Sequence, residues 1–461
     1  MAALTLAEVA RMTGAAVLHG SPGLAFARYG IDSRLTAGGE LFFAVPGRRD
    51  GHDFVAAAAA AGAAGAVVSR PVEPPASGFG LLLVPDTVAA LQALARGVLA
   101  LHPVKVVGVT GSVGKTTTKE FAAALLAARF RVLKSEGNFN NRLGLALSVL
   151  RLEPGHGAAV LEMGMSAPGE IRELTRVAPP DVAVVTNIAP VHLEFFRDLD
   201  GIARAKKEIL DGARPGAAAV LNADDPRVMA IAADFPGRRV TFGQAAGADV
   251  RAASVAPRGY AGFEIDLRYG TEQGLLPFPF LNRAAVADLL AAAAVSLALG
   301  LRLAEIVPAV AALRPAARRG LLVEAPGGVR VYDDAYNSSP RALEAALTSL
   351  AGLPARRRVA VLGDMLELGE GGRDFHRAAG ETVARTGWDL LVAVGPLAAA
   401  MAEGASAAGL GAAAVLRFAD AASAAAAVAG LVRDGDLVLV KGSRGMRMET
   451  VVEALRAGGK E

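Results

Sequence analysis

The stretch from Val104 to Glu120 holds the residues whose types and spacing point most directly to chemistry. It reads V-K-V-V-G-V-T-G-S-V-G-K-T-T-T-K-E, an apolar run followed by a turn of small residues and then by a segment with apolar positions at helical spacing. Gly114, Lys115 and Thr116 at the predicted helix start supply backbone N–H groups, an ammonium and a hydroxyl, which suit a polyphosphate and its Mg²⁺. The pattern indicates an ATP site.

This phosphate-binding loop is a variant of the strict pattern. The spacing G-x-x-x-x-G-K-[ST] requires a glycine at position 109, where the chain has Val109, and glycines stand at Gly108 and Gly111 instead. A glycine-rich turn that binds nothing is the alternative interpretation. The Lys-Thr pair that follows Gly114 argues against it, because that pair stands where phosphate chemistry needs an ammonium and a hydroxyl.

The composition narrows the class of protein. A chain of 461 residues is long enough for about three domains. Its 48 Lys and Arg residues against 45 Asp and Glu are scattered and give a net charge of +3, which argues against a nucleic-acid groove. With no Cys and six His, a metal site must rely on carboxylates and other oxygen ligands. No signal-like or membrane-spanning run is evident, so we expect a cytoplasmic enzyme without an integral membrane segment.

Strand and helix patterns alternate along the chain and predict an α/β protein of three domains, at 1–102, 103–313 and 314–461. For the first domain the patterns predict helices at 6–12 and 54–63 and strands at 40–45, 66–69 and 81–84. Polar residues at 32–34 and 47–52 flank the first of these strands and could bind a polar ligand. Ordinary turn chemistry explains them equally well.

Polar residues end the predicted strands of the middle domain. These strands are continuous apolar runs, which predict a mostly parallel sheet, at 158–163, 182–187 and 218–222. Because ligands of such sheets bind beyond the carboxyl ends of the strands, Glu162, Asn187 and His192 are expected near Lys115, which favours metal binding and catalysis. The alternatives are a helix cap for Glu162 and a surface loop for His192.

Two segments of the middle domain differ from this pattern. Phe263 to Tyr269 alternates apolar and charged residues, which predicts a half-exposed antiparallel strand followed by a turn at 270–274, and an alanine-rich helix is predicted at 284–301. The third domain is predicted to be a doubly wound sheet with strands at 329–333, 359–363, 390–394, 415–418 and 437–441. Several of these strands also end in polar residues, so we expect a ligand cleft between the second and third domains.

Several of these segments resemble the Mur ligases of peptidoglycan precursor synthesis. They are Gly108–Thr116, Glu136–Asn141, Leu161–Gly164, Thr186–Glu194 and Ala205–Ile209. Three segments of the last domain, at 333–340, 362–369 and 441–449, look like the family members that add D-alanyl-D-alanine to UDP-N-acetylmuramoyl-tripeptide. The resemblance implies a small UDP-binding α/β domain, a central P-loop ATPase-like domain and a Rossmann-like C-terminal ligase domain.

The resemblance further implies an ATP-dependent, ADP-forming peptide ligase that uses two Mg²⁺ ions. Thr116 and Glu162 would hold one ion and His192 the other, while Arg319 would reach the phosphates. The glycine that the family shows before this arginine is Arg318 here. The implied catalytic residues are Lys115, Lys206, His192 and Arg319. The implied ATP-binding residues are Thr110, Gly111, Ser112, Val113, Gly114, Lys115, Thr116, Thr117, Asp334, Tyr336 and Asn337.

A second implied site would hold the UDP-linked substrate. Its residues would be Ser33, Arg34, Asp50, His52, Asn138 and Asn141. The chain departs from the family at the adenine contact: where the family shows His-Asn-x-x-Asn at a helix start, this chain has Ala284, Ala285 and Asp288. Asn282 lies near but out of register, so the residues that contact the base are not identified.

Lys206 has two interpretations that disagree about its charge. From the residues alone, Lys206 and Lys207 on a predicted helix are two solvated cations. The resemblance implies instead that the Lys206 amine carries CO₂ as a carbamate, an anionic oxygen ligand suited to Mg²⁺. The implied metal ligands are then Thr116, Glu162, His192 and Lys206.

The implied reaction converts the terminal carboxylate of the tripeptide into an acyl phosphate, which the amine of D-alanyl-D-alanine attacks. Two alternatives stay open: a folylpolyglutamate synthetase-like ligase, which should lack the Asp32-Ser33-Arg34 pocket domain, and a non-enzymatic P-loop switch. We expect a monomer that binds no nucleic acid and whose partners are the two substrates. The third residue of the tripeptide is left open.

Overall fold

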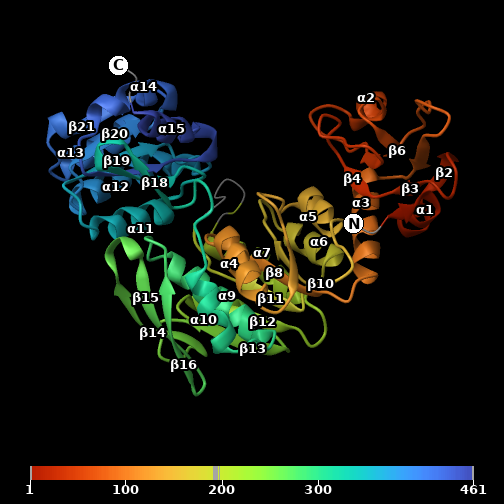
Figure 1. Ribbon diagram of the computed structural model, residues 1–461, viewed down its shortest axis with the longest axis horizontal. Coiled ribbons are helices and arrows are strands. Elements are labelled where there is room, and N and C mark those ends of the chain that lie inside the picture. The colour runs from red at the N-terminus through yellow and green to blue at the C-terminus, as the bar shows by residue number, and fades with distance from the viewer. Residues whose placement is uncertain (1–2, 191–195, 197, 459–461) are drawn as a thin grey trace. The chain divides into compact units, whose positions relative to one another are not determined.

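The computed structural model describes residues 3–190, 196 and 198–458 (Figure 1). Its contacts divide the chain into two compact units. The first consists of Met1–Ile188, Asp200–Phe242 and Ala291–Arg302, and the second of Ala189–Leu199, Gly243–Leu290 and Leu303–Glu461. Among the described helices, none is both long and apolar enough to cross a membrane.

The N-terminal part of the first unit is built on a five-stranded sheet with the order β2-β7-β6-β5-β4. The parallel strands are β4 (Arg28–Gly30), β5 (Glu40–Phe43), β6 (Ala63–Val68) and β7 (Gly80–Leu83), and the edge strand β2 (Ala16–His19) is antiparallel. A separate pair joins β1 (Leu4–Thr5) to β3 (Ala25–Phe26). The helices are α1 (Leu6–Thr13), α2 (Val55–Ala60) and α3 (Thr87–Ala100).

The predicted helix at 54–63 is wrong at its end. The helix α2 ends at Ala60, and Ala63 already belongs to β6. The cause is Gly62, whose φ of +107° lies in a region that favours glycine and reverses the chain between helix and strand. An alanine-rich run has no periodicity that could reveal this break.

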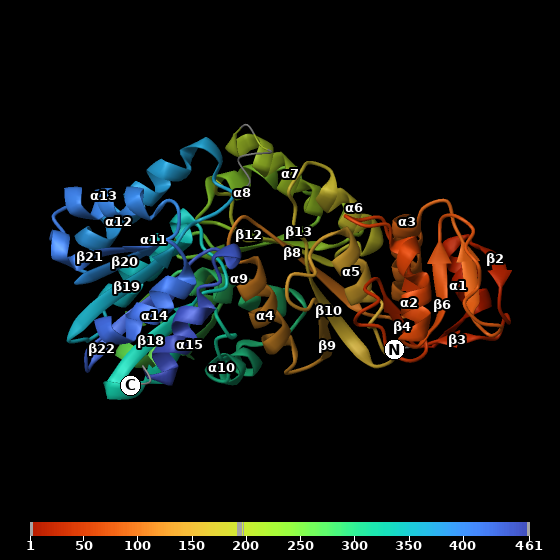
Figure 2. The same cartoon turned by 90° about the horizontal axis from the view of Figure 1, so that it is seen from above.

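The larger sheet of the first unit carries the predicted phosphate-binding loop. Its parallel strands follow the order β13-β12-β11-β8-β10-β9. They are β8 (Lys105–Thr110), β9 (Arg131–Lys134), β10 (His156–Glu162), β11 (Val182–Val185), β12 (Ala218–Asn222) and β13 (Arg238–Gly243). The helices are α4 (Lys115–Leu126), α5 (Arg142–Val149), α6 (Glu170–Val177), α7 (Leu199–Asp211) and α8 (Pro226–Ile231). The parallel sheet is therefore confirmed, and α4 and α5 pack against β10 (Figure 2).

The second unit contains three antiparallel strands. The strands β14 (Val250–Pro257), β15 (Phe263–Tyr269) and β16 (Glu272–Phe278) pair in sequence order, which confirms the predicted strand at 263–269. The predicted turn at 270–274 is too long, because Glu272 already pairs with Tyr269. Two helices follow in the chain, α9 (Ala285–Ala298) and α10 (Leu303–Ala311).

The C-terminal sheet is doubly wound, as predicted, with the strand order β17-β18-β22-β19-β20-β21. The strands are β17 (Leu321–Ala325), β18 (Val329–Asp334), β19 (Arg357–Gly363), β20 (Leu390–Val394), β21 (Val415–Phe418) and β22 (Asp436–Lys441), and β17 alone in this sheet is antiparallel to its neighbour. The helices are α11 (Pro340–Ala351), α12 (Gly372–Arg385), α13 (Ala398–Ala407), α14 (Ala421–Leu431) and α15 (Glu449–Ala457).

Alternating strand residues of this sheet face two separate cores. In β19, Ala360 and Leu362 pack with α11, α12 and α13, whereas Val359 and Val361 pack with α14 and α15 (Figure 1). Helices on both faces explain why the strands read as continuous apolar runs.

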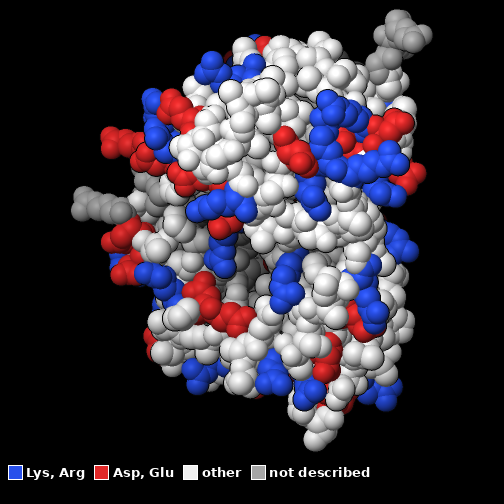
Figure 3. All heavy atoms as spheres, turned by 90° about the vertical axis from the view of Figure 1, so that its left-hand side faces the viewer, with Lys and Arg blue, Asp and Glu red and all other residues white. Residues whose placement is uncertain are grey.

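Basic and acidic side chains are interspersed on the face of the molecule drawn in Figure 3. This agrees with the nearly equal numbers of basic and acidic residues in the sequence.

Candidate active site

The loop between β8 and α4 has the backbone that its glycines predict. Gly111 has a φ of +150° and Gly114 a φ of +87°, and a Cβ added at Gly111 would lie 1.8 Å from Oγ1 of Thr186. Gly114 directly precedes α4, so the N–H groups of the first helical turn are available to an anion. Position 109, where the strict pattern has a glycine, lies within β8 and not in the loop, and Val109 is fully buried there.

Two residues that directly follow β11, Thr186 and Asn187, hold this loop in place. The side chain of Asn187 accepts a hydrogen bond of 3.0 Å from the N–H of Val113 and donates one of 2.8 Å to the carbonyl of the same residue. The hydroxyl of Thr186 donates to that carbonyl as well, at 2.7 Å. Asn187, which was selected from the sequence as a polar strand end, therefore positions the loop. The hydrogen bond that Thr186 makes to the loop could not be predicted from the sequence.

Lys115 lies folded over its own loop. Its ammonium donates hydrogen bonds of 2.9 Å to the carbonyl of Gly111 and 3.2 Å to that of Ser112. A polyphosphate in the loop would offer this ammonium anionic oxygens in place of two neutral carbonyls. The side chain is thus held at the place where the sequence predicts a phosphate contact.

Thr116 and Glu162 are brought together from the start of α4 and the end of β10. The threonine hydroxyl donates a 2.8 Å hydrogen bond to Oε2 of Glu162, which is only 2% exposed. The other carboxylate oxygen accepts a 2.9 Å hydrogen bond from the side-chain amide of Asn140, a residue that the sequence analysis did not select. A hydroxyl and a carboxylate in contact are two oxygen ligands of the kind that Mg²⁺ prefers.

Lys206 is a buried lysine. It lies in α7, is 2% exposed, and among the described residues no acidic side chain pairs with it. Burial lowers its pKa well below the usual value, and the positive charge of Lys115 lowers it further. Its neighbour Lys207 is different, because ion pairs with Asp211 and Asp234 raise the pKa of that lysine. The interpretation of two solvated cations is therefore wrong for Lys206.

The second predicted metal site would use His192 and Lys206. His192 lies outside the described residues. Within the described part of the chain, no group of three or more His, Asp or Glu side chains is arranged to hold a metal ion. The ligand types that the chain does bring together are the Thr116 hydroxyl and the Glu162 carboxylate, which fit an ion whose remaining ligands are phosphate oxygens and water.

Part of the predicted UDP-substrate cluster gathers at the carboxyl edge of the N-terminal sheet. Oδ1 of Asp50 contacts Nδ1 of the buried His52 at 2.6 Å, and Nε2 of that ring accepts a 2.9 Å hydrogen bond from the N–H of Ser69. Arg70 also donates to Asp50, at 3.1 Å. These hydrogen bonds hold the pKa of Asp50 well below its usual range, the bond with His52 being the largest cause.

The other predicted members are not joined to this group by described contacts. The guanidinium of Arg34 forms a hydrogen-bonded ion pair with Asp32, and this hydrogen bond lowers the pKa of Asp32 to about 2. Ser33 lies between these two residues in the chain. Asn138 is exposed, and Asn141 caps α5 with its side-chain oxygen, which accepts from the N–H groups of Leu143 and Gly144. The capping role accounts for Asn141 without any ligand.

The predicted nucleotide residues of the second unit do come together. The guanidinium of Arg319 stacks on the ring of Tyr336, with Cζ 3.8 Å from the ring centroid, and Arg444 donates a 3.0 Å hydrogen bond to the tyrosine hydroxyl. Nearby in the chain, Lys441 donates to Oδ2 of Asp334 at 2.5 Å and to the carbonyl of Asn337 at 2.9 Å. The sequence did not reveal that Lys441 and Arg444 would support this cluster.

Two positions that depart from the family pattern lie in well-defined local structure. Arg318, at the position of the family's glycine, has a φ of +62°, and its carbonyl accepts a 3.0 Å hydrogen bond from the N–H of Tyr336. At the start of α9, the side-chain oxygen of Asn282 accepts from the N–H of Ala284. The side-chain oxygen of Asn282 is therefore already engaged at the position out of register with the family's asparagine.

Comparison with known proteins agrees with this arrangement. Family models match residues 26–98 (Mur ligase family, catalytic domain), 109–296 (Mur ligase middle domain) and 318–444 (Mur ligase, glutamate ligase domain). The UDP-N-acetylmuramoyl-tripeptide–D-alanyl-D-alanine ligase of Bacillus subtilis (strain 168) is 35% identical over 426 residues, which are 92% of each chain.

Two solved structures are similar over nearly the whole chain. A crystal structure of MurF from Acinetobacter baumannii has a TM-score of 0.90 at 31% identity and covers 99% of both chains. MurF from Thermotoga maritima, in complex with ADP, has a TM-score of 0.81 at 31% identity and covers 94% of this chain and 97% of its own. The chain belongs to the Mur ligase family of ATP-dependent peptide ligases, in the MurF branch.

Proposed function

We propose that this protein joins D-alanyl-D-alanine to UDP-N-acetylmuramoyl-tripeptide with conversion of ATP to ADP and phosphate, in the synthesis of peptidoglycan precursors. The observation that carries the proposal is the contact of Thr116 with Glu162 beside a loop that holds Lys115, in a chain 35% identical to a ligase of that name. The product serves cell-wall growth and hence cell shape and division. The reaction belongs in the cytoplasm, where ATP is available.

The chemistry needs an activated carboxylate, because a free carboxylate does not react with an amine at neutral pH. In the proposed reaction an oxygen of the tripeptide's terminal carboxylate attacks the γ-phosphorus of ATP, forming an acyl phosphate and releasing ADP. The amine of D-alanyl-D-alanine then attacks the acyl carbon, and phosphate leaves with that oxygen. Both steps concentrate negative charge on oxygens, which Lys115 and Arg319 would stabilise.

The phosphate-binding loop would hold ATP by its backbone N–H groups and by the Lys115 ammonium. The loop residues proposed for this role are Thr110, Gly111, Ser112, Val113, Gly114, Lys115, Thr116 and Thr117. The proposed contacts from the C-terminal domain are Arg319, Asp334, Tyr336 and Asn337, and the stacked Arg319–Tyr336 pair supports them by presenting a guanidinium whose orientation is held by the ring.

Thr116 and Glu162 would hold one Mg²⁺, with His192 and Lys206 at a second. When bound, Mg²⁺ would neutralise phosphate charge during the transfer. For Lys206 we propose a carbamate, formed when the neutral amine adds CO₂ and loses a proton. The amine is buried, and no acidic side chain of the described residues neutralises it. Burial and the nearby charge of Lys115 lower its pKa, which favours the neutral form that reacts with CO₂.

The UDP-linked substrate would bind to Ser33, Arg34, Asp50, His52, Asn138 and Asn141, of which Asp50 and His52 already form a linked pair. The functional division at 1–102, 103–313 and 314–461 and a monomeric state are parts of this proposal. The family-model match at 26–98 speaks against the folylpolyglutamate synthetase-like alternative, from which a pocket domain of this kind is not expected.

The full chain with ATP and Mg²⁺ provides the test. Phosphate release is measured with UDP-N-acetylmuramoyl-tripeptide alone, with D-alanyl-D-alanine alone and with both together. We expect sustained release only when both are present. Release with neither substrate would support a P-loop switch, and release with a folate and glutamate would support the alternative ligase; either result would contradict the proposal.

A further inference from the structure

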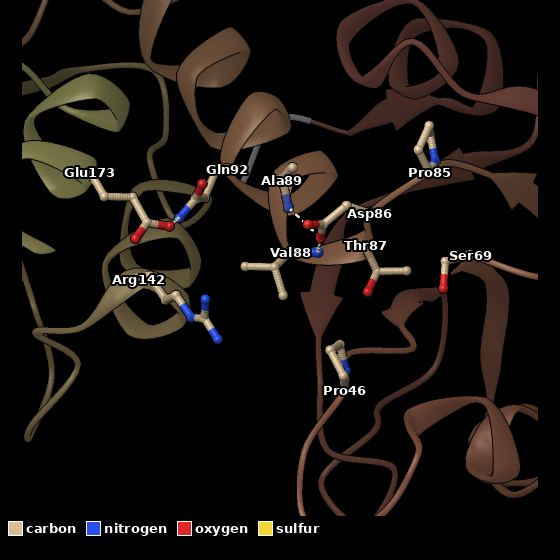
Figure 4. A pocket seen from close by; sticks show the side chains of 10 residues that line it. All are labelled: Pro46, Ser69, Pro85, Asp86, Thr87, Val88, Ala89, Gln92, Arg142 and Glu173. Carbon is tan, nitrogen blue, oxygen red and sulfur yellow. Dashed lines mark hydrogen bonds between the residues drawn. The ribbon is translucent and has the colours of Figure 1, made fainter. Parts of the chain in front are cut away.

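A pocket of about 290 Å³ lies at the carboxyl edge of the N-terminal parallel sheet (Figure 4). Pro46, Ser69 and Pro85, which follow β5, β6 and β7, line one side of it. Arg142 and Glu173, from the starts of α5 and α6, line the other. The ends of parallel strands are where sheets of this kind bind ligands.

Arg142 is the charged donor of this pocket that the protein itself leaves unused. Within the described part of the chain its guanidinium has no hydrogen-bond or ion-pair partner. In Figure 4 its side chain extends from α5 toward the space in front of Val88 and Pro46. A guanidinium presents a planar set of N–H donors that matches the oxygens of a carboxylate or a phosphate.

The two acidic residues that line the pocket are engaged elsewhere. Asp86 caps α3, where its Oδ1 accepts from the N–H groups of Val88 and Ala89, and Glu173 accepts a 2.6 Å hydrogen bond from the side chain of Gln92. Neither carboxylate pairs with Arg142. An anionic ligand could therefore contact Arg142 without first breaking an internal ion pair.

The pocket is continuous with the cluster proposed to bind the UDP-linked substrate. Ser69, which lines the pocket, donates its N–H to Nε2 of His52, and His52 contacts Asp50. On the opposite side Arg142 directly follows Asn141, whose side-chain oxygen is used to cap α5. The guanidinium is therefore available to a ligand, whereas the oxygen of the Asn141 side chain is already engaged.

We infer that Arg142 binds an oxyanion of the UDP-linked substrate and so contributes to the recognition of that substrate. The inference rests on the proposed function. The oxyanion is either the diphosphate or a carboxylate of the muramoyl peptide, since both offer the same geometry to a guanidinium. Arg142 would act in binding rather than in phosphoryl transfer.

Calorimetric binding to the full chain tests this with Arg142→Gln, Arg142→Lys and a matched control, Arg176→Gln. Arg176 is an exposed arginine of α6 that does not line the pocket, so its loss changes the net charge equally. For UDP-N-acetylmuramoyl-tripeptide we expect Kd to rise about tenfold in Arg142→Gln, less in Arg142→Lys, and not in the control. In turnover, the KM for this substrate should rise while kcat and the KM for ATP stay unchanged.

UDP and UDP-N-acetylglucosamine have a diphosphate but no carboxylate. Their binding shows whether Arg142 contacts the diphosphate or a carboxylate of the muramoyl peptide. An equal loss of affinity for these ligands would assign the diphosphate, and a loss confined to the muramoyl peptide would assign a carboxylate. Unchanged binding of all three ligands by Arg142→Gln would overturn the inference while leaving the proposed function intact. If the unmodified protein bound none of them, the proposed function would fail as well.

Discussion

The hydroxyl of Thr116 donates a 2.8 Å hydrogen bond to Oε2 of Glu162, which joins the first turn of α4 to the last residue of β10. Asn140 holds the other oxygen of that carboxylate. The carboxylate is thus fixed in place before any ligand arrives, beside the loop that carries Lys115. A hard cation bound here would meet two oxygen ligands that need little rearrangement.

Replacing Glu162 by Gln should therefore weaken the use of Mg²⁺. The variant keeps an acceptor for Thr116 but removes the negative charge, so we expect the Mg²⁺ concentration for half-maximal activity to rise at least about tenfold. A Mg²⁺ titration of the ligation rate measures it. Glu153→Gln, at a surface residue paired with Arg131, is the control and should leave the titration unchanged. An identical Mg²⁺ dependence in both variants would contradict the metal role of Glu162.

Lys115→Ala should abolish ligation without unfolding the protein. The change removes one charge from the phosphate-binding loop and opens no core, and a lost electrostatic donor of this kind costs about 2.7–4 kcal/mol, or roughly 10² to 10³ in rate. Turnover and the thermal unfolding midpoint are measured together. The exposed Lys105, at the start of β8, provides the control substitution Lys105→Ala. Near-normal turnover in Lys115→Ala would exclude the loop as the phosphate site.

The two lysines of α7 should respond differently to substitution. We expect Lys206→Ala to lose activity and Lys207→Ala to keep most of it, because Lys207 only pairs with Asp211 and Asp234 at the surface. With ¹³C-labelled bicarbonate, a carbamate signal should be present in the unmodified protein and in Lys207→Ala but absent in Lys206→Ala. A short carboxylic acid should partly restore the activity of Lys206→Ala, since it can occupy the vacated ligand position. Full activity of Lys206→Ala would contradict the carbamate.

Most of the fold could be predicted from the sequence, because buried parallel strands are strongly patterned. The strands β12, β15, β20 and β21 have the predicted boundaries. The helix at 54–63 was predicted too long, since an alanine run carries no periodicity and the break depends on the conformation of Gly62.

The candidate site was less accessible to sequence reasoning. Residue types at strand ends were sufficient to select Glu162. Its partner Asn140 could not be identified, because it lies 22 residues earlier in the chain and the contact depends on the conformation of the loop that carries it. Burial of a side chain is a second property that the neighbouring sequence does not reveal. Lys206 and Lys207 are adjacent in the same helix, but their side chains leave it in different directions, so that one amine is buried and the other is ion-paired.

Arg318 provides a prediction on stability. With a φ of +62° it occupies a conformation that a side chain disfavours by about 1 kcal/mol, so Arg318→Gly should unfold at a higher temperature than Arg318→Ala. Both variants lose the ion pair with Glu449, so the difference between their unfolding temperatures reports the backbone conformation alone. At an ordinary position the order is reversed, because glycine is the less stable residue. A lower unfolding temperature for Arg318→Gly would show that the backbone relaxes here.

The central claim is that ATP activates the substrate's own carboxylate before the amide bond forms. The direct measurement uses UDP-N-acetylmuramoyl-tripeptide labelled with ¹⁸O in its terminal carboxylate, together with ATP and D-alanyl-D-alanine, and determines the products by mass spectrometry. We expect the UDP-linked pentapeptide, ADP, and phosphate that carries one ¹⁸O atom for each peptide bond formed. Phosphate without ¹⁸O, or its release without a pentapeptide product, would contradict the account.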